Sequence, residues 1–501
     1  MRAQPLVPAA DGGGVRQRFG VTIVLAGLAA ACASAPPCPA TPGSQGEQEN
    51  GPTHVVATRK AGSRGCAERA VPARTLAPAP SFVAVPIEDP SGRALAAFHA
   101  ALHRAQAKQG QARIAFYGAS HVAADIYTEV IRVRLQERFG DAGAGFALPA
   151  KPLTHYHVAS IDFESSVGWT GVHVKVGDPP GGRYGLAGMY VVAGRKPAHS
   201  AFSLRARSGL TGHVSELELY YWKQPKGGHL RVDIDGEPHE IATAAARGKA
   251  AYQRFALPDA EHHVELATRR DGPVQLFGMV LERDTPGVVL DTLGIPGARA
   301  ANQLLWDEQL FREHLRRRNH DLVVLAYGTN EAGDDAQPIE EYAANLRAVV
   351  ARVRNAVPTA SCLLIGPSDR PDRTEEGAYV DRPRTMLVAN VQRQVARENG
   401  CGFFDMIAFM GGPLSMLHWV DQDPPLAAPD HVHFTYRGYE ILGNVLYDDL
   451  LSGYGIGQAL PERAEPRQAA PEPQPDAQPS GVTPQAPIAP VNADRDTPQT
   501  P

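Results

Sequence analysis

The chain has 501 residues, of which 43% are hydrophobic, and it carries a formal net charge of −5. A chain of this length and composition can bury a full core and should hold more than one domain. Its mildly acidic charge and its lack of a basic run exclude nucleic acid as the main partner.

Residues 1–32 have the layout of a secretory signal peptide. Arg16 and Arg18 precede an apolar run, Val21–Ala31, which is shorter than the about 20 residues that a membrane-spanning helix needs. Cys32 follows this run and resembles the lipidated cysteine of bacterial lipoproteins. Alternatively, cleavage at the A-x-A-like site around Cys32 would release a soluble protein. We therefore expect export, with the protein periplasmic or held at a bacterial outer membrane by a lipid anchor only.

Residues 33–82 and 455–501 are rich in Pro and Ala and poor in large apolar residues, so we expect a disordered tether and a disordered tail. Cys38 and Cys66 lie in the tether and could pair in an oxidising compartment. Cys362 and Cys401 each begin an apolar run and are interpreted as small buried residues. No cysteine or histidine spacing is typical of a metal site, and we expect no metal or cofactor.

The folded part is predicted to begin with residues 83–145. An amphipathic helix, Ala94–Gln109, leads into a strand, Ile114–Tyr117, then a turn, Gly118–His121, and a second helical pattern. Ser120 therefore lies between the carboxyl end of a strand and the amino end of a helix, where unpaired backbone N–H groups favour a nucleophile. The alternative is that Ser120 only caps the helix.

Residues 146–283 lack a helical pattern and instead show short alternating segments separated by turns rich in Gly and Pro. This pattern predicts an all-β sandwich inserted into the α/β domain. Trp169, Tyr184 and Trp222 are candidates for stacking on sugar rings, and the alternative is that these rings belong to the core. From its place in the chain, the insert is expected to overhang the site without supplying catalytic residues.

Residues 284–454 return to alternating strands and helices. The predicted strands are Val288–Leu290, Leu322–Ala326, Leu363–Ile365 and Phe403–Asp405, and the predicted helices are Asn302–Arg317, Tyr342–Ala356, Pro383–Glu398 and one that follows Thr435. Such alternation predicts a doubly wound parallel sheet with helices on both faces. Ligands bind outside the carboxyl ends of the strands in sheets of this kind.

Three further motifs fall in the predicted loops of this second part. Gly294–Gly297 and Tyr327–Glu331 each follow a buried strand, and Asp430–Thr435 precedes the last helix. A serine hydroxyl becomes a nucleophile only with a histidine base that a carboxylate orients. The last motif supplies both groups.

Together with the Gly-Ala-Ser-His turn, these motifs resemble the four blocks of the SGNH (GDSL-type) hydrolases, which have a flavodoxin-like doubly wound fold. The resemblance implies that Ser120 is the nucleophile, that Asp430 and His433 complete a triad, and that Gly297 and Asn330 form the oxyanion hole. More narrowly, DTLGIPGAR, GTNE and DHVHFTYRGY are similar to bacterial peptidoglycan O-acetylesterases. In those proteins a carbohydrate-binding-module-like β domain lies at the same place as the insert.

Some of these residues have other interpretations. His433 is preferred as base over His431 and His121 because its three-residue step from the aspartate matches the family pair, and His121 is left as a candidate pocket-lining residue. Asn330 and Gly297 could instead be a helix cap and a turn glycine.

We therefore expect an exported serine esterase that removes O-acetyl groups from a cell-wall polysaccharide, in the first place peptidoglycan. An O-acetyltransferase is an alternative, because a sugar can resolve the same acyl-enzyme. A wall-binding lipoprotein with a decayed site is another, since Ala119 stands where the family usually has aspartate. The second block also departs from the family pattern, with Pro296 in its usual Gly-x-Ser-Gly.

Overall fold

The computed structural model describes residues 82–455, apart from residues 178, 195, 205 and 207–209. The predicted signal peptide with Cys32, nearly all of the predicted tether with Cys38 and Cys66, and nearly all of the predicted tail lie outside the described residues. Within the described part, every helix is too short or too polar to cross a membrane.

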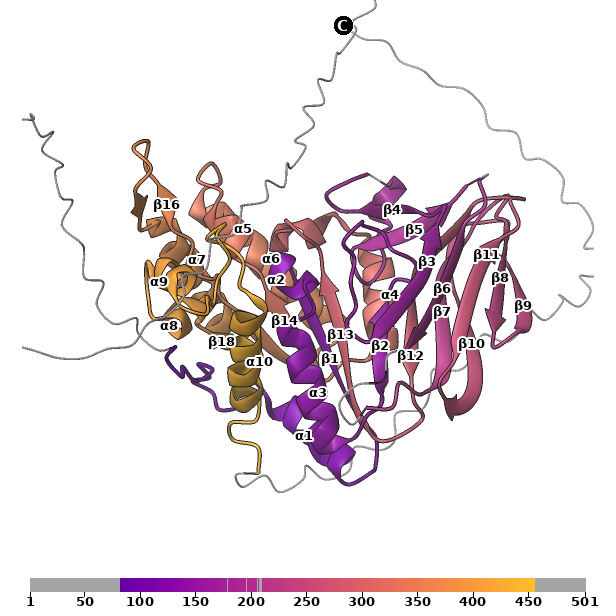
Figure 1. Ribbon diagram of the computed structural model, residues 1–501, viewed down its shortest axis with the longest axis horizontal. Helices are drawn as coiled ribbons and strands as arrows, with labels where there is room; N and C mark the ends of the chain where they lie inside the picture. The colour runs from indigo at the N-terminus through magenta and orange to yellow at the C-terminus, as the bar shows by residue number, and fades with distance from the viewer. Residues whose placement is uncertain (1–81, 178, 195, 205, 207–209, 456–501) are drawn as a thin grey trace, which may run out of the picture. The chain divides into compact units, whose positions relative to one another are not determined.

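A parallel sheet of five strands forms the centre of the α/β domain in the described part of the chain (Figure 1). Its order is β13-β1-β14-β15-β18, so the second strand of the sheet lies at one edge beside the first, as in flavodoxin-like folds. The predicted doubly wound sheet is confirmed. The strands are β1 Gln111–Gly118, β13 Gly287–Gly294, β14 Leu322–Ala326, β15 Ser361–Ile365 and β18 Gly402–Phe404.

Helices cover both faces of this sheet (Figure 1). Ile114 and Phe116 of β1 pack with helices α1, α3 and α10, whereas Ala115 and Tyr117 belong to the core under α4, α6 and α7. Alternate residues of the strand thus serve opposite layers. The helices are α1 Ala96–Gln106, α2 Ser120–Ala123, α3 Tyr127–Phe139, α4 Glu308–Arg318, α5 Thr329–Ala332, α6 Ile339–Ala356, α7 Pro383–Glu398, α8 Met406–Met410, α9 Ser415–Asp421, α10 Tyr436–Leu450, and the 3₁₀ helices η1 Pro180–Gly182 and η2 Ala300–Leu305.

One predicted helix is divided in the structure. Residues Asn302–Arg317 were expected to form a single helix, but η2 ends at Leu305 and α4 begins at Glu308. The side chain of Asp307 accepts a hydrogen bond from the backbone N–H of Leu310 at 2.7 Å, which caps a new helix at this point.

The carboxyl ends of the three strands that precede the predicted site loops are aligned. Gly118 at the end of β1 pairs with Gly294 of β13 on one side and with Ala326 of β14 on the other. The loops that follow these strands therefore leave the sheet at the same height and side by side.

The insert forms two antiparallel sheets, as predicted (Figure 1). One has the order β10-β7-β12-β5-β4 with β2 also paired to β12, and the other has the order β3-β6-β11-β8-β9. The predicted boundary at residue 146 falls inside β2. The strands are β2 Gly143–Ala147, β3 Ile161–Val167, β4 Thr170–His173, β5 Met189–Ala193, β6 His199–Leu204, β7 Val214–Lys223, β8 His229–Ile234, β9 Glu237–Ala242, β10 Lys249–Ala260, β11 His263–Thr268 and β12 Val274–Glu282, and a separate hairpin is made by β16 Asp372–Arg373 and β17 Tyr379–Val380.

The sandwich packs directly on α4. The ring of His314 is buried between Tyr220 and Phe277, with ring centroids 5.2 and 5.3 Å away, and the Tyr252 hydroxyl donates to Glu313 at 2.6 Å. The buried residues of the sandwich and of the α4 face form one continuous core. The insert therefore shares its hydrophobic core with the hydrolase domain and is not an independent module on a linker.

The three aromatic residues proposed for sugar stacking lie against this core. Tyr184 is buried, and its hydroxyl donates to the carbonyl of Gly177 at 2.9 Å. Trp169 and Trp222 are half-buried and pack against the core, so the alternative of a core role fits all three rings.

Cys362 and Cys401 form a disulfide, with Cα atoms 4.6 Å apart. Their interpretation as merely small buried residues is therefore wrong. The reason lies in the sheet register, because Leu363 pairs with Gly402 in the parallel ladder of β15 and β18. The residues one step earlier in each strand are consequently neighbours.

A buried ion pair joins the sheet to the sandwich. Arg318 of α4 donates two hydrogen bonds to the Asp291 carboxylate of β13, each 2.8 Å long, and one to Glu282 of β12 at 2.6 Å. Burial would raise the pKa of Asp291, but Arg318 and His320 hold it well below its usual value. The Asp291 carboxylate also accepts the backbone N–H of Phe146 in β2 at 2.8 Å.

Arg318→Met should therefore destabilise the protein by about 3–5 kcal/mol, because it leaves two buried carboxylates without their main counter-charge. Urea unfolding of the purified variant measures this change. Arg347→Met is the matched control, since Arg347 pairs with Glu398 on the surface, where both side chains are more than a third exposed. Coinciding unfolding curves for the two variants would contradict the role given to Arg318.

Candidate active site

The nucleophile turn joins β1 to a single turn of helix. β1 ends at Gly118, Ala119 is the N-cap residue of α2, and Ser120 is the first residue inside that helix. Ser120 is thus not the N-cap, so the alternative role for this serine does not hold. Its half-buried side chain turns to the loop before α10 instead.

Ser120, His433 and Asp430 form a continuous chain of hydrogen bonds. The Ser120 Oγ lies 2.8 Å from His433 Nε2, and His433 Nδ1 lies 2.6 Å from Asp430 Oδ2. The other carboxylate oxygen, Oδ1, accepts the backbone N–H groups of Val432 and His433, each at 3.0 Å. The structure therefore brings together the three residues that the motifs predicted.

These hydrogen bonds keep Asp430 ionised. Burial would raise the pKa of the Asp430 carboxyl, but the His433 ring and the backbone N–H groups of His433 and Val432 lower it below its usual value. An ionised carboxylate on Nδ1 fixes the tautomer in which His433 Nε2 can accept a proton from Ser120.

Gly297 lies in the loop after β13, in a tight turn. The backbone N–H of Ala298 donates to the carbonyl of Ile295 at 3.0 Å, with Pro296 second and Gly297 third in the turn. Gly297 has a φ of +71°, which is the conformation that a type II turn requires at this position and that glycine adopts without strain. Pro296 therefore suits this turn.

Asn330 lies within α5, after β14, and does not cap it, since the N-cap residue is Gly328. Its Nδ2 donates to the carbonyl of Ala298 at 2.9 Å, in the loop of Gly297. A side-chain amide has two N–H donors, so this bond orients the amide and leaves the second donor for a ligand. The two predicted oxyanion-hole residues are thus held in neighbouring loops.

Glu331 ties these two loops together, a role that sequence reasoning missed. Its buried carboxylate accepts the N–H of Ala300 at 2.8 Å and the N–H of Gly328 at 3.0 Å. Burial raises the pKa of this carboxyl, and the backbone hydrogen bonds offset the rise only in part. The GTNE motif contains Glu331, but nothing in the motif shows that its partner lies in another loop.

The Ser120 hydroxyl bonds to His433, whereas the rings of His121 and His431 have other hydrogen-bond partners. His121 is buried, with Nδ1 2.9 Å from the Tyr439 hydroxyl and Nε2 3.4 Å from Ser368 Oγ, and its ring centroid lies 5.6 Å from that of His433. His431 Nδ1 lies 3.1 Å from the Tyr379 hydroxyl. The preference for His433 as base agrees with this geometry.

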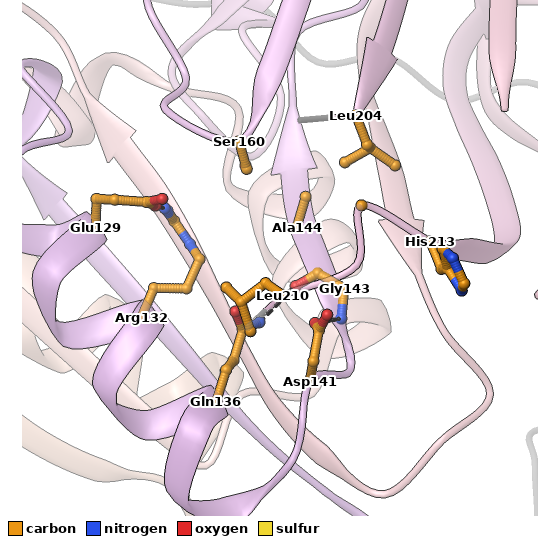
Figure 2. Close-up of a pocket in the computed structure, with 11 residues that line it drawn as sticks. Glu129, Arg132, Gln136, Asp141, Gly143, Ala144, Ser160, Leu204, Leu210 and His213 are labelled. Atoms are coloured by element: carbon orange, nitrogen blue, oxygen red, sulfur yellow. Dashed lines mark hydrogen bonds and ion pairs between the residues drawn. The ribbon is translucent and has the colours of Figure 1, made fainter. Parts of the chain in front are cut away.

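A small cavity lies away from these residues, where α3 meets β2 and the segment before β7 (Figure 2). Arg132 pairs there with Glu129, and Gln136 Nε2 donates to the carbonyl of Gly143 at 2.8 Å. The cavity measures about 30 Å³, whereas a single water molecule needs on the order of 10–15 Å³ by the same measure. It has no room for a substrate. Throughout the described ranges, His, Cys, Asp and Glu side chains do not gather in threes to hold a metal ion.

The buried position of His121 makes stability depend on pH. Burial, and to a smaller extent the nearby His433, lower its pKa from 6.5 to about 3, and Asp430 opposes this shift. Between these two values the unfolded chain binds a proton that the folded protein does not bind. The contribution of His121 to stability is therefore present above pH 6.5 and is lost as the pH falls towards 3.

His121→Phe keeps the ring but removes this titration, so the loss of unfolding free energy between about pH 7.5 and pH 5.0 should be smaller in the variant than in the wild-type protein. Urea unfolding at both pH values measures the two differences. The variant should be less stable at each pH because Tyr439 and Ser368 lose a partner. Equal pH dependence in both proteins would show that His121 titrates normally when folded.

Comparisons with known proteins agree with this geometry. The model of the GDSL-like lipase/acylhydrolase family matches residues 261–441, which include Gly297, Asn330, Asp430 and His433. Ser120 precedes this segment because the sandwich separates it from the other three loops. No curated protein matches the sequence of the chain.

Among solved structures, a peptidoglycan O-acetylesterase is 25% identical, with a TM-score of 0.61, and the match covers 74% of this chain and 99% of that protein. A family two carbohydrate esterase from Clostridium thermocellum, an active-site mutant, is 11% identical over 57% of this chain and 99% of its own, with a TM-score of 0.27. A salicylyl-acyltransferase from a tetracycline biosynthetic pathway is 16% identical over 62% and 98%, with a TM-score of 0.28. Of these three matches, only that to the peptidoglycan O-acetylesterase, with its TM-score of 0.61, is evidence of structural similarity. The chain thus contains a GDSL-like hydrolase domain, and it is a serine esterase with the SGNH hydrolase fold that resembles peptidoglycan O-acetylesterases.

Proposed function

We propose that this protein is an exported carbohydrate esterase that removes O-acetyl groups from a cell-wall polysaccharide, in the first place peptidoglycan. The observation that carries the proposal is the chain of hydrogen bonds from Ser120 through His433 to Asp430. The peptidoglycan O-acetylesterase that matches over 99% of its own length supports the choice of substrate.

In the proposed reaction, Ser120 Oγ attacks the acetyl carbonyl carbon while His433 Nε2 takes the hydroxyl proton. The carbonyl oxygen becomes an oxyanion, which the backbone N–H groups of Ser120 and Gly297 and the Asn330 amide stabilise. When the intermediate collapses, the sugar oxygen leaves with the proton held by His433. Water then attacks the acetyl-serine in the same way, which releases acetate and restores Ser120.

Two features support the proposed export. The Cys362–Cys401 disulfide is of a kind that forms and persists in oxidising compartments outside the cytosol. The sequence of residues 1–32 has the layout of a signal peptide, and the proposal includes a lipid anchor on Cys32 as the only membrane attachment.

Purified protein should release acetate from O-acetylated peptidoglycan, and Ser120→Ala should lower kcat by on the order of 10⁶-fold, because it removes the attacking atom. Acetate release, measured with an enzymatic acetate assay, tests this. Circular dichroism of the variant controls for folding.

The same assay separates the alternatives. Addition of a sugar acceptor should leave acetate release unchanged, whereas a transferase would pass the acetyl group to the acceptor and release less acetate. A decayed site would give no release from any acetyl ester. Full activity in Ser120→Ala would exclude this serine as nucleophile.

A further inference from the structure

A cavity of about 330 Å³ lies beside the catalytic loops and is lined by both parts of the protein. The hydrolase domain contributes the last residue of α2, two residues at the end of β13 and one residue of the loop after β13, and the insert contributes the loop before β3. The lining residues are Ala123, Thr292, Gly294 and Pro296 from the hydrolase domain and Leu153, Thr154, His155, Tyr156 and His157 from the insert.

The cavity adjoins Ser120 and Gly297 through the chain itself. Ala123 ends the single helical turn that Ser120 begins, and its backbone N–H donates to the carbonyl of Ala119 at 2.9 Å. The backbones of Gly294 and Ala123 are in close contact, since a Cβ on Gly294 would come within 2.2 Å of the Ala123 nitrogen. Pro296 directly precedes Gly297. A ligand in the cavity therefore lies against the two loops that hold the nucleophile and the oxyanion turn.

Asp125 holds the two walls of the cavity together. One carboxylate oxygen accepts the backbone N–H of Ala159 at 2.8 Å, just after the insert loop, and the other accepts the Thr292 hydroxyl at 2.7 Å. Asp125 is buried and pairs with Arg132. The Tyr156 hydroxyl accepts the N–H of Leu148 at 2.8 Å, which fixes the insert loop a second time. Hydrogen bonds therefore hold both walls of the cavity in place.

The size and lining of the cavity indicate its ligand. An acetyl group has only three heavy atoms, whereas pockets of about 300 Å³ and more are typical of whole small-molecule ligands. Leu153, Pro296 and the Tyr156 ring offer apolar surface for the C–H face of a sugar ring. Thr154 and the imidazoles of His155 and His157 offer hydrogen-bonding groups for hydroxyl and amide groups. A long acyl chain would use none of these polar groups.

We propose that this cavity is a subsite for a pyranose ring of the glycan, of the N-acetylhexosamine type, and that the insert loop 153–157 helps to select the substrate. The proposal rests on the proposed function in naming the glycan as substrate. It assigns the insert a direct part in substrate binding, although the insert supplies no triad residue.

Binding of N,N′-diacetylchitobiose to the Ser120→Ala variant tests the proposal without any need for turnover. In this background, Thr154→Trp places a bulky ring at the exposed rim of the cavity and should weaken binding at least tenfold in calorimetric titration. Thr359→Trp is the matched control, because Thr359 is exposed before the amino end of β15, at the opposite end of the sheet from the catalytic loops. It should leave the affinity unchanged, and circular dichroism should show both variants folded.

Equal affinities in the two tryptophan variants, or no binding by Ser120→Ala itself, would overturn the subsite. A second measurement, made on proteins that keep Ser120, distinguishes a sugar subsite from a pocket for acyl chains. Should Thr154→Trp lower kcat/KM for 4-nitrophenyl octanoate while its Ser120→Ala counterpart still binds the disaccharide, the cavity holds acyl chains and the proposal is wrong. If the proposed function itself were wrong, the wild-type protein would release no acetate, which is a different result from the loss of the subsite.

Discussion

The alignment of three parallel strands at their carboxyl ends is the constraint on which the site depends. Gly118, Gly294 and Ala326 are direct neighbours across the sheet, so the loops that carry Ser120, Gly297 and Asn330 begin side by side. Short turns then suffice to bring a hydroxyl, a backbone N–H and a side-chain amide to one place. The His433 loop enters from the start of α10, which packs against α3, the helix that follows the nucleophile turn.

The sandwich is fixed to this frame through Asp291. Its buried carboxylate forms hydrogen bonds with Arg318 of α4, with His320 and with the backbone N–H of Phe146 in β2 of the sandwich. Since the ion pair is buried, loss of one partner would leave the other charge without compensation. The insert is therefore held so that its loop 153–157 forms one wall of a cavity beside the helical turn that Ser120 begins.

Sequence patterns predicted the parts of the structure that depend on local chemistry. The strands are visible as apolar runs because both faces of the sheet are buried. Ser120 could be singled out because it lies in a short strand-to-helix turn, and Asp430 and His433 because their three-residue step matches the pair of the SGNH hydrolases that the chain resembles. The disulfide, the break at Asp307 and the role of Glu331 could not be predicted, because each depends on a partner distant in the chain or on a choice between two helix starts. The buried position of His121 also depends on partners, Tyr439 and Ser368, from other elements.

In the proposed reaction, Ser120 carries the acyl group between the two half-reactions. The most direct test is to quench the protein with acid during turnover of 4-nitrophenyl acetate and to locate the acetyl group by mass spectrometry of proteolytic peptides. One acetyl group is expected on the peptide that contains Ser120, and none on the same peptide of Ser120→Ala. Acetylation of another residue in step with turnover would contradict this role of Ser120.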